Sequence, residues 1–169
     1  MKRCYIAFGS NQDAPLAQLQ IARETLREHA DMQEAAASSI YRTPPWGFTE
    51  QPDFYNAVIA YDSALSAQDL LCLLQSIETA QHRERPFKNA PRTLDLDILT
   101  YGDQQEHTPT LSLPHPRMHE RAFVLEPLAE IAPQLMIAGQ GIVADLLAGL
   151  DCSAQEKITV AAWDNLAAG

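Results

Sequence analysis

The hydrophobic residues of this chain follow two spacings, one typical of strands and one typical of helices. Runs rich in aromatic and β-branched residues predict strands. Leu70, Leu74 and Ile77 recur every three or four residues and predict a helix with one apolar face. In chain order the pattern predicts a strand at 4–8, a helix at 15–29, an extended segment at 33–42, a strand at 54–62, a helix from about 66 to 82 and a strand at 93–101.

The order β-α-β-β-α-β indicates an α+β fold. Two βαβ halves with short connections predict a ferredoxin-like antiparallel sheet with helices packed on it. We expect a short strand at 111–114 and extra C-terminal helices at 118–132, where Pro127 would bend or break the helix, and at 141–149. No repeat or linker divides the chain, so residues 1–169 should form one domain, with 151–169 as an extension that the pattern leaves unassigned.

The charge distribution limits the possible partners. A formal net charge of −10 argues against general binding to nucleic acids or anionic membranes. Residues 83–121 are neutral nevertheless, because they hold six basic and six acidic side chains. This clustering suits a small polyanion and its metal, although a solvated charged loop would have the same composition.

The three cysteines match neither a disulfide framework nor a metal-binding pair. Cys4, Cys72 and Cys152 are therefore expected to be small buried hydrophobic residues of a cytoplasmic protein in a reducing environment. The apolar runs are too short for a membrane helix, and no secretory signal is expected at the start of the chain.

Residues 92–99, RTLDLDIL, carry the most informative pattern. Alternate residues of a strand point to the same face, so Asp95 and Asp97 project together, with side-chain origins roughly 6.5–7 Å apart. The apolar residues between and beside them take the other face and anchor the strand in the core. Mg²⁺ is the natural partner of such a pair, because it is commonly held by one or two carboxylates and by substrate phosphates. The alternative is that both acids are solvated, or paired with Arg92 and Arg121.

Arginine side chains are the candidates for holding phosphates. The chain contains neither GxxxxGKS/T nor GxGxxG, which excludes a glycine-rich backbone cradle. Arginine can instead bind phosphate through bidentate, charge-assisted hydrogen bonds. Basic candidates flank the aspartates on both sides: Arg83, Arg85, Lys88 and Arg92 precede them, and His115, Arg117 and Arg121 follow.

A second cluster lies on the predicted strand 54–62, where Phe54 and Asn56 share one face. An aromatic ring beside an amide can stack on a flat heterocycle and read its hydrogen-bonding edge. Asparagine is disfavoured in strands, which makes Asn56 the stronger candidate, whereas Phe54 alone would be a core aromatic. The stiff loop before it, RTPPWG at 42–47, could form one wall of the pocket.

Five ordered motifs run along the chain: AFGSN at 7–11, YRTPPWG at 41–47, QPDFYNA at 51–57, APRTLDLDIL at 90–99 and LPHPRMHERAFVLEPLAEIAP at 113–133. In content and spacing they resemble the 6-hydroxymethyl-7,8-dihydropterin pyrophosphokinase family. The resemblance implies a ferredoxin-like fold and transfer of pyrophosphate from ATP to the hydroxymethyl group of the dihydropterin, with release of AMP, in folate biosynthesis. The chain departs from several relatives in lacking a tryptophan in KNAPR at 88–92 and from some in having Phe54 in place of tyrosine.

The resemblance also implies roles for individual residues. Asp95 and Asp97 would hold two Mg²⁺ ions, and Arg83 and Arg92 would act with them in catalysis by neutralising the transferring group. The ATP site would comprise Gln75, Glu78, Arg83, Arg85, Arg92, Ile98, His115 and Arg121. The pterin site would comprise Thr43, Pro44, Pro45, Trp46, Phe54, Asn56, Asp95 and Phe123. A monomer with these two small-molecule partners is expected.

Two other function classes remain open from the sequence. A non-catalytic ferredoxin-like module could bind a small heterocycle or nucleotide as a regulatory ligand, but it would not need paired aspartates ringed by arginines. A metal-dependent nucleotidyltransferase also uses paired aspartates, but it would release pyrophosphate rather than AMP.

Overall fold

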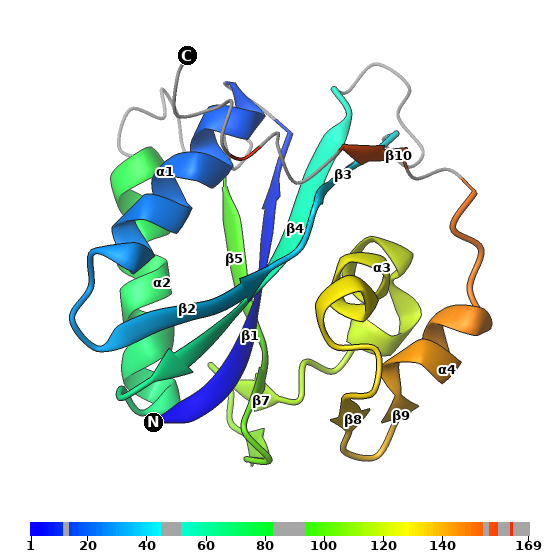
Figure 1. Cartoon of the computed structure of the whole chain (residues 1–169). Coiled ribbons are helices and arrows are strands. Elements are labelled where there is room, and N and C mark those ends of the chain that lie inside the picture. The colour runs from blue at the N-terminus through cyan, green and yellow to red at the C-terminus, as the bar shows by residue number, and fades with distance from the viewer. Residues whose placement is uncertain (12–13, 45–51, 83–93, 154–155, 159–162, 164–169) are drawn as a thin grey trace.

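The computed structural model describes residues 1–11, 14–44, 52–82, 94–153, 156–158 and 163. Its centre is an antiparallel sheet with the strand order β10-β3-β4-β1-β5, in which β2 also pairs with β4 (Figure 1). The strands of this sheet are β1 (Lys2–Ser10), β2 (Met32–Ala37), β3 (Ile40–Thr43), β4 (Phe54–Ser63), β5 (Asp95–Tyr101) and β10 (Glu156–Ile158).

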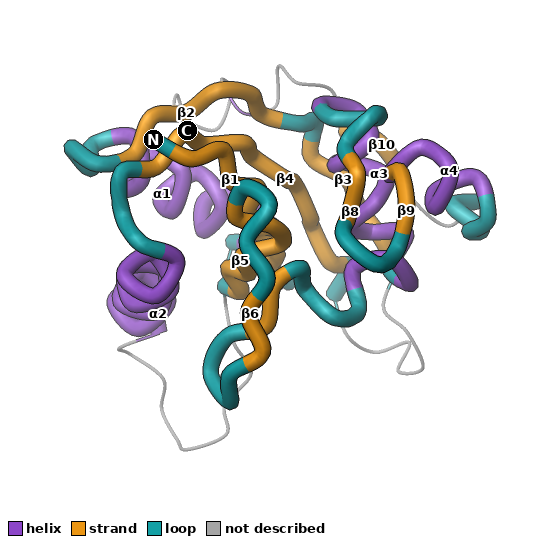
Figure 2. Tube along the Cα trace, turned by 90° about the horizontal axis from the view of Figure 1, so that it is seen from below, coloured by secondary structure: helices purple, strands orange, loops and turns teal. Residues whose placement is uncertain are grey.

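Helices cover both faces of the sheet. Helices α1 (Pro15–Arg27) and α2 (Ala67–His82) lie on one face, and α3 (Ala122–Ile131) and α4 (Val143–Ala148) lie on the other (Figures 1 and 2). Each face has its own core. Leu19 of α1 and Leu70 of α2 belong to the first core, and Val124 of α3 and Val143 of α4 belong to the second. The expected antiparallel sheet with packed helices and extra C-terminal helices is thus confirmed. None of the helices among the described residues has the length and hydropathy to cross a membrane.

The segment 33–42, predicted as one extended piece, forms two strands that are separated at Ser38 and Ser39. The amide of Val58 donates to Oγ of Ser38 at 2.9 Å, so a side chain replaces a regular ladder contact here. Both serines are fully buried. The interruption depends on a partner in another strand, which is why the local hydrophobic pattern did not reveal it.

The C-terminal helices also differ in detail from the prediction for 118–132. Residues Met118–Glu120 form a 3-10 turn, and α3 begins only after Arg121, whose backbone is extended (φ −111°, ψ 104°). Helix α3 then continues through Pro127, so the helix does not break there although one helical hydrogen bond is lost. The short hairpins β6 (Glu106–His107) with β7 (Ser112–Leu113) and β8 (Met136–Ile137) with β9 (Gly141–Ile142) precede and follow this region, and β7 confirms the strand expected at 111–114.

The cysteines match the expectation of buried hydrophobic residues only in part. Cys4 is fully buried, and this burial raises the pKa of its thiol to about 12. Cys152 is half-buried, and Cys72 is exposed. Cys72 lies off the apolar stripe of α2, where Leu70 and Leu74 take the buried positions, so the expectation was wrong for this residue.

Candidate active site

Strand pairing brings residues from three strands into rows on one face of the sheet. Gly9 of β1 pairs with Asn56 of β4 on one side and with Asp95 of β5 on the other. Ala7 pairs with Asp97 of β5 in the next row. Directly paired residues of antiparallel strands point to the same face, so the amide and both carboxylates face the side on which α3 packs.

The alternation predicted for β5 is observed. Asp95 and Asp97 are exposed, whereas Leu96 and Ile98 are 4% and 5% exposed and belong to the core under α1 and α2. The apolar residues therefore hold the strand in place while both carboxylates stand on the opposite face.

Glycine at position 9 leaves room for the Asn56 amide. A Cβ atom at Gly9 would lie 2.9 Å from Oδ1 of Asn56, closer than a non-bonded contact allows. With Ala7 two residues earlier on the same face, this end of β1 presents almost no side-chain volume between Asn56 and the two aspartates. The two small residues thus form a shallow floor between Asn56 and the aspartates.

Thr43 and Phe54 form a further row at the ends of β3 and β4. Thr43 is only 7% exposed, and its Oγ1 has no hydrogen-bond partner among the described residues. Pro44 follows directly and is exposed. A buried hydroxyl with an unused hydrogen-bonding capacity suits a polar ligand at this end of the floor.

The start of α3 supplies the opposite wall. Arg121 and Phe123 lie at its first turn, with the guanidinium of Arg121 5.7 Å from the centre of the Phe123 ring. Helix α3 is fixed to β3 at its other end, because Glu130 accepts hydrogen bonds from the Tyr41 hydroxyl at 2.8 Å and from the Ser39 amide. Burial and the Glu130 carboxylate raise the pKa of Tyr41, which keeps its hydroxyl a donor.

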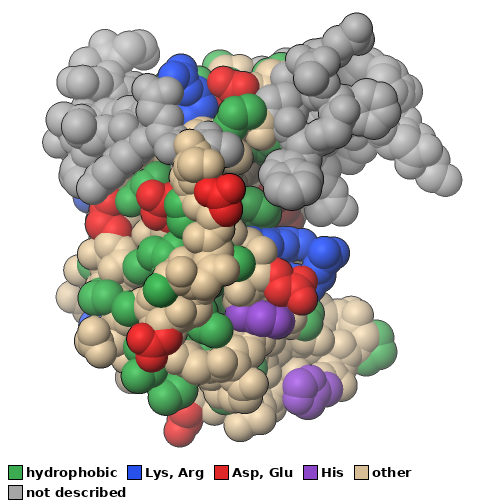
Figure 3. Space-filling model, turned by 90° about the vertical axis from the view of Figure 1, so that its right-hand side faces the viewer, with side chains coloured by type: hydrophobic (Ala, Val, Ile, Leu, Met, Phe, Trp, Pro, Cys, Tyr) green, Lys and Arg blue, Asp and Glu red, His purple; other side chains and the backbone are tan. Residues whose placement is uncertain are grey.

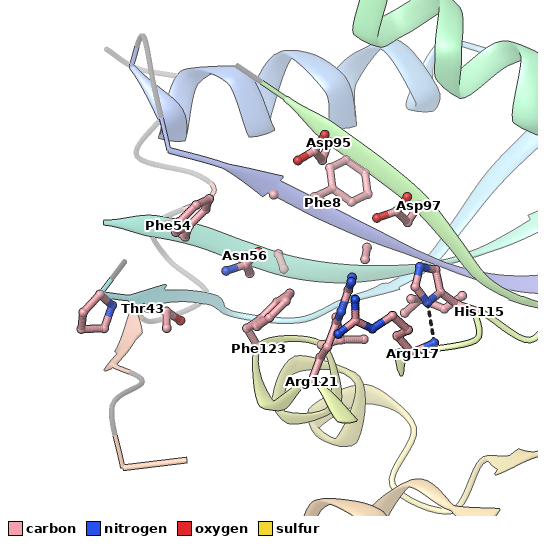
Figure 4. A pocket seen from close by; sticks show the side chains of 16 residues that line it. Phe8, Thr43, Phe54, Asn56, Asp95, Asp97, His115, Arg117, Arg121 and Phe123 are labelled. Carbon is pink, nitrogen blue, oxygen red and sulfur yellow. Dashed lines mark hydrogen bonds between the residues drawn. The ribbon is translucent and has the colours of Figure 1, made fainter. Parts of the chain in front are cut away.

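His115 and Arg117 close the charged end of the site. The His115 amide donates to the Leu99 carbonyl at 2.8 Å, which attaches the segment to β5. The Arg117 amide donates to Nδ1 of His115 at 3.2 Å, so the neutral ring carries its proton on Nε2 (Figure 4). Burial lowers the pKa of His115; Asp97 opposes this shift, while Arg121 and Arg117 reinforce it.

These groups surround one cavity of about 430 Å³, a size typical of small-molecule sites. In Figure 4, Phe54, Asn56 and Phe123 lie toward one end and Asp97, His115, Arg117 and Arg121 toward the other. Basic, acidic and histidine side chains also gather beside a hollow on the face seen in Figure 3. The cavity thus combines an aromatic end that carries the Asn56 amide with a charged end that carries Asp97, and Asp95 lies in the same row as Asn56.

The structure brings together most of the predicted site residues that it describes. The cavity is lined by Thr43, Pro44, Phe54, Asn56, Asp95, Asp97, His115, Arg121 and Phe123. Five others lie outside the described residues: Pro45, Trp46, Arg83, Arg85 and Arg92.

Three residues assigned to the ATP site do not line the cavity. Gln75 is exposed on α2. Glu78, also on α2, accepts a hydrogen bond from the Leu96 amide at 3.1 Å, next to the two aspartates. The Ile98 side chain is buried on the opposite face of β5, so a contact with a ligand in this cavity would involve its main chain.

Several lining residues were not assigned a role from the sequence. Arg117 was noted among the flanking basic residues but was not placed in the site, although it lines the cavity. Gly9 and Ala7 also line it, and only the register of β1 against β4 and β5 reveals why they are small.

The donor set fits Mg²⁺ together with a phosphate ligand. Asp95 and Asp97 provide two carboxylates at the cavity, and no cluster of three or more acidic, histidine or cysteine ligands occurs among the described residues. Mg²⁺ is typically bound by one or two carboxylates and completes its shell with water and substrate phosphates. An all-protein cage, as calcium or structural zinc would prefer, is not provided by these residues.

The chain resembles solved structures over most of its length. It matches HPPK-DHPS crystallised in complex with substrates with a TM-score of 0.72 at 12% identity, covering 94% of this chain and 47% of the other. A variant of Plasmodium falciparum HPPK-DHPS gives a TM-score of 0.74 at 13% identity and covers 94% and 49%. The chain thus spans about half the length of these proteins, and at such identities the comparison establishes the fold.

Sequence comparison identifies the family. A protein of Methylorubrum extorquens named 2-amino-4-hydroxy-6-hydroxymethyldihydropteridine pyrophosphokinase is 44% identical, covering 94% of this chain and 99% of the relative. One of the same name from Pseudomonas aeruginosa is 40% identical and covers 94% and 98%. Residues 5–133 match the family described as 7,8-dihydro-6-hydroxymethylpterin-pyrophosphokinase. The chain therefore belongs to the 7,8-dihydro-6-hydroxymethylpterin-pyrophosphokinase (HPPK) family.

Proposed function

We propose that this protein transfers pyrophosphate from ATP to 6-hydroxymethyl-7,8-dihydropterin and releases AMP, a step of folate biosynthesis. Family membership supports the reaction. The observation that carries it is the row Asn56–Gly9–Asp95, which sets a heterocycle-reading amide and a phosphate-side carboxylate on one floor. The pterin hydroxyl gives up its proton and its oxygen forms a bond to the β-phosphorus, as the bond between the β-phosphorus and the oxygen bridging to the α-phosphorus breaks. That oxygen leaves with AMP.

The aromatic end of the cavity holds the pterin in this proposal. Phe54 and Phe123 come from β4 and α3 and flank Asn56 in Figure 4, an arrangement that suits a flat ring between two aromatic faces. The Asn56 amide offers both donors and an acceptor to the ring edge. Thr43 Oγ1, which has no partner among the described residues, takes a further hydrogen bond. Pro45 and Trp46 complete the pocket wall in this assignment.

The charged end holds the triphosphate. Asp95 and Asp97 would bind two Mg²⁺ ions, which when bound supply positive charge to the phosphate oxygens and acidify a coordinated hydroxyl. Arg121 and His115 contact the phosphates, His115 as a neutral Nε2–H donor because its pKa is lowered by burial. We add Arg117, which lines the same end. Gln75, Glu78, Arg83, Arg85, Arg92 and the main chain of Ile98 complete the ATP side, with Arg83 and Arg92 neutralising the group in transfer.

The protein accelerates the reaction mainly by placing the two substrates. Phosphoryl-type transfer leaves little covalent chemistry to the enzyme, and alignment can lower a barrier by about 7–11 kcal/mol in favourable cases. The floor formed by Ala7 and Gly9 lets the substrate ring and the phosphate chain lie close to the same strand.

Coarser features of the protein fit the same assignment. The strand order β3-β4-β1-β5, all antiparallel, supports a ferredoxin-like plan, to which β10, α3 and α4 are additions. We propose that residues 1–169 act as one domain and as a monomer. Three cysteines without a disulfide pattern support a cytoplasmic setting.

Nucleotide product analysis tests the proposal. Purified protein is incubated with ATP, Mg²⁺ and hydroxymethyl dihydropterin, and the products are separated by anion-exchange chromatography. AMP and pyrophosphorylated pterin are expected in equal amounts, with no AMP when the pterin is omitted. Release of pyrophosphate would indicate a nucleotidyltransferase, and unchanged ATP would indicate a binding module; either result contradicts the proposal.

A further inference from the structure

A residue near the end of the chain reaches the core behind the cavity. Trp163 lies beyond residues 5–133, the part matched by the family, yet it is only 1% exposed. Its indole Nε1–H donates to the Ser38 carbonyl at 2.8 Å, at the break between β2 and β3. A fully buried tryptophan with its N–H satisfied is a strong anchor, because both its area and its polar group are used.

The indole touches the residue that carries the floor of the site. Its ring meets the Phe8 ring edge to face, with centroids 6.5 Å apart and planes at 83°. Phe8 is 1% exposed in the core under α1 and α2, and the next residue, Gly9, faces the cavity between Asn56 and Asp95. Trp163 thus lies directly behind the row that the proposed pterin site uses.

The strand before Trp163 supports a second wall. Strand β10 pairs antiparallel with β3, with Glu156 opposite Arg42 and Ile158 opposite Ile40. Thr43 is the last residue of β3, and Thr43 and Pro44 both line the cavity. Without β10, the edge of β3 next to these two residues would lose its ladder hydrogen bonds.

A buried charge holds the indole from its other side. The guanidinium of Arg23 lies 4.7 Å from the centre of the Trp163 ring, within the range of a cation–π contact. Arg23 is oriented by two hydrogen bonds to Glu34, at 2.8 and 3.0 Å. The indole is therefore fixed by α1, by the β2–β3 break and by β1 at once.

We infer that Trp163 is a positioning residue for the pterin end of the cavity, acting through Phe8–Gly9 and through the Ser38 carbonyl; this inference rests on the proposed function. Trp163 contacts Phe8, next to Gly9, and the Ser38 carbonyl at the break before β3, the strand that ends at Thr43. Gly9 also neighbours Asp95, but Asp97, His115, Arg117 and Arg121 of the charged end lie further from these contacts, on β5, on residues 115–117 and just before α3. The two substrates should accordingly respond differently to a change at position 163.

Steady-state kinetics with each substrate varied in turn separates the two responses. W163A opens space behind Phe8 and removes the bond to Ser38, so it should raise the KM for the pterin about tenfold and the KM for ATP less than about twofold. W163F keeps an aromatic ring but not the N–H and should raise the pterin KM about threefold. Circular dichroism first shows whether each variant folds. If W163A does not fold, the kinetics of W163F alone test the inference.

A matched control distinguishes positioning from general stability. Leu70 is also fully buried in the same core, but it lies in the first turn of α2, and no described residue of α2 lines the cavity. L70A should lower the melting temperature and leave both KM values unchanged. Equal rises in both KM values, or no change in a folded W163F, would overturn the inference alone. A wild-type protein that forms no AMP with the pterin would overturn the proposed function instead.

Discussion

Two groups of charged residues on opposite faces of the central sheet differ in how their charges are paired. On the face under α1, the buried Arg23 guanidinium bonds to Glu34 at 2.8 Å, and Arg27 adds a third contact at 3.2 Å. On the face under α3, Asp97 and Arg121 both line the cavity, and neither forms an ion pair with another described residue. The charges of Arg23 and Glu34 are thus paired within the protein, while those of Asp97 and Arg121 stand at the cavity.

This difference separates stability from function. A buried charge that already has its partner contributes to the fold, and removing one member leaves the other without compensation. Charges that face a cavity add little to the fold and can even oppose it, since like charges are held close together. Substituting a charged residue of one group or of the other should therefore change different measured quantities.

The largest effect is expected at the aspartate pair. D97A removes a carboxylate that faces the cavity, and turnover should fall at least about 10²–10³-fold, as for other removals of a preorganised electrostatic group. The melting temperature should stay the same or rise, because Asp97 is exposed and stands near Asp95. Turnover is measured as AMP formed with saturating substrates.

An acid on the same sheet provides the control for D97A. Asp62 forms a surface ion pair with Arg3 at 2.7 Å. It lies at the far end of β4 from the residues that line the cavity. D62N should leave turnover unchanged. A D97A protein with wild-type turnover would show that the exposed carboxylate is not used by the reaction.

The next largest effect is expected on the face under α1, and it concerns the free energy of unfolding rather than turnover. E34Q keeps the shape of Glu34 but removes its charge beside the buried Arg23, so the free energy of unfolding should fall by about 1–3 kcal/mol. The kcat of the folded variant should remain at the wild-type value. Urea unfolding followed by fluorescence gives the first quantity, and a loss of kcat without loss of stability would erase the contrast between the faces.

A smaller effect, on the pterin KM, is expected at Gly9, where the backbone of β1 lies against the Asn56 amide. In G9A the new Cβ would stand 2.9 Å from Oδ1 of Asn56, so the amide must move and the pterin KM should rise up to about tenfold. G149A is the matched change, because its Cβ would meet nothing closer than 3.6 Å. If G9A and G149A bound the pterin equally well, Asn56 would not be the group that reads the ring.

The smallest effect is the pH dependence of stability, and it again concerns Glu34 on the face under α1. Burial alone would raise the pKa of Glu34, but the hydrogen bonds and charges of Arg23 and Arg27 lower it below the ordinary 4.5. The stabilisation is therefore complete above the unfolded-state pKa and is lost as the pH falls through the lower folded-state pKa. The stability difference between wild type and E34Q should stay constant near neutral pH and shrink in acid; a difference that grows in acid would reverse the assigned sign.

The parts of the site carried by a single strand could be predicted from the sequence. Period-two alternation placed Asp95 and Asp97 on one face of β5 and Leu96 on the other, as observed. Phe54 and Asn56 were placed together for the same reason, and both line the cavity. Each of these inferences needed only residues within a few positions of one another.

The parts that depend on strand register could not be predicted. The need for Gly9 appears only when β1 is aligned with Asn56 of β4. The break at Ser38 depends on Val58, and β10 depends on a partner strand more than a hundred residues earlier in the chain. No local pattern of polar and apolar residues encodes such pairings, which is why the region after residue 150 was left unassigned.

We propose that the carboxylates of β5 at the cavity, Asp95 and Asp97, bind the divalent ions that hold ATP. A crystal grown with a non-hydrolysable ATP analogue and Mn²⁺ in place of Mg²⁺, measured at the manganese absorption edge, tests it directly. Anomalous peaks are expected between the carboxylates of Asp95 and Asp97 and the phosphates. Bound nucleotide with both carboxylates turned away from every peak would contradict it.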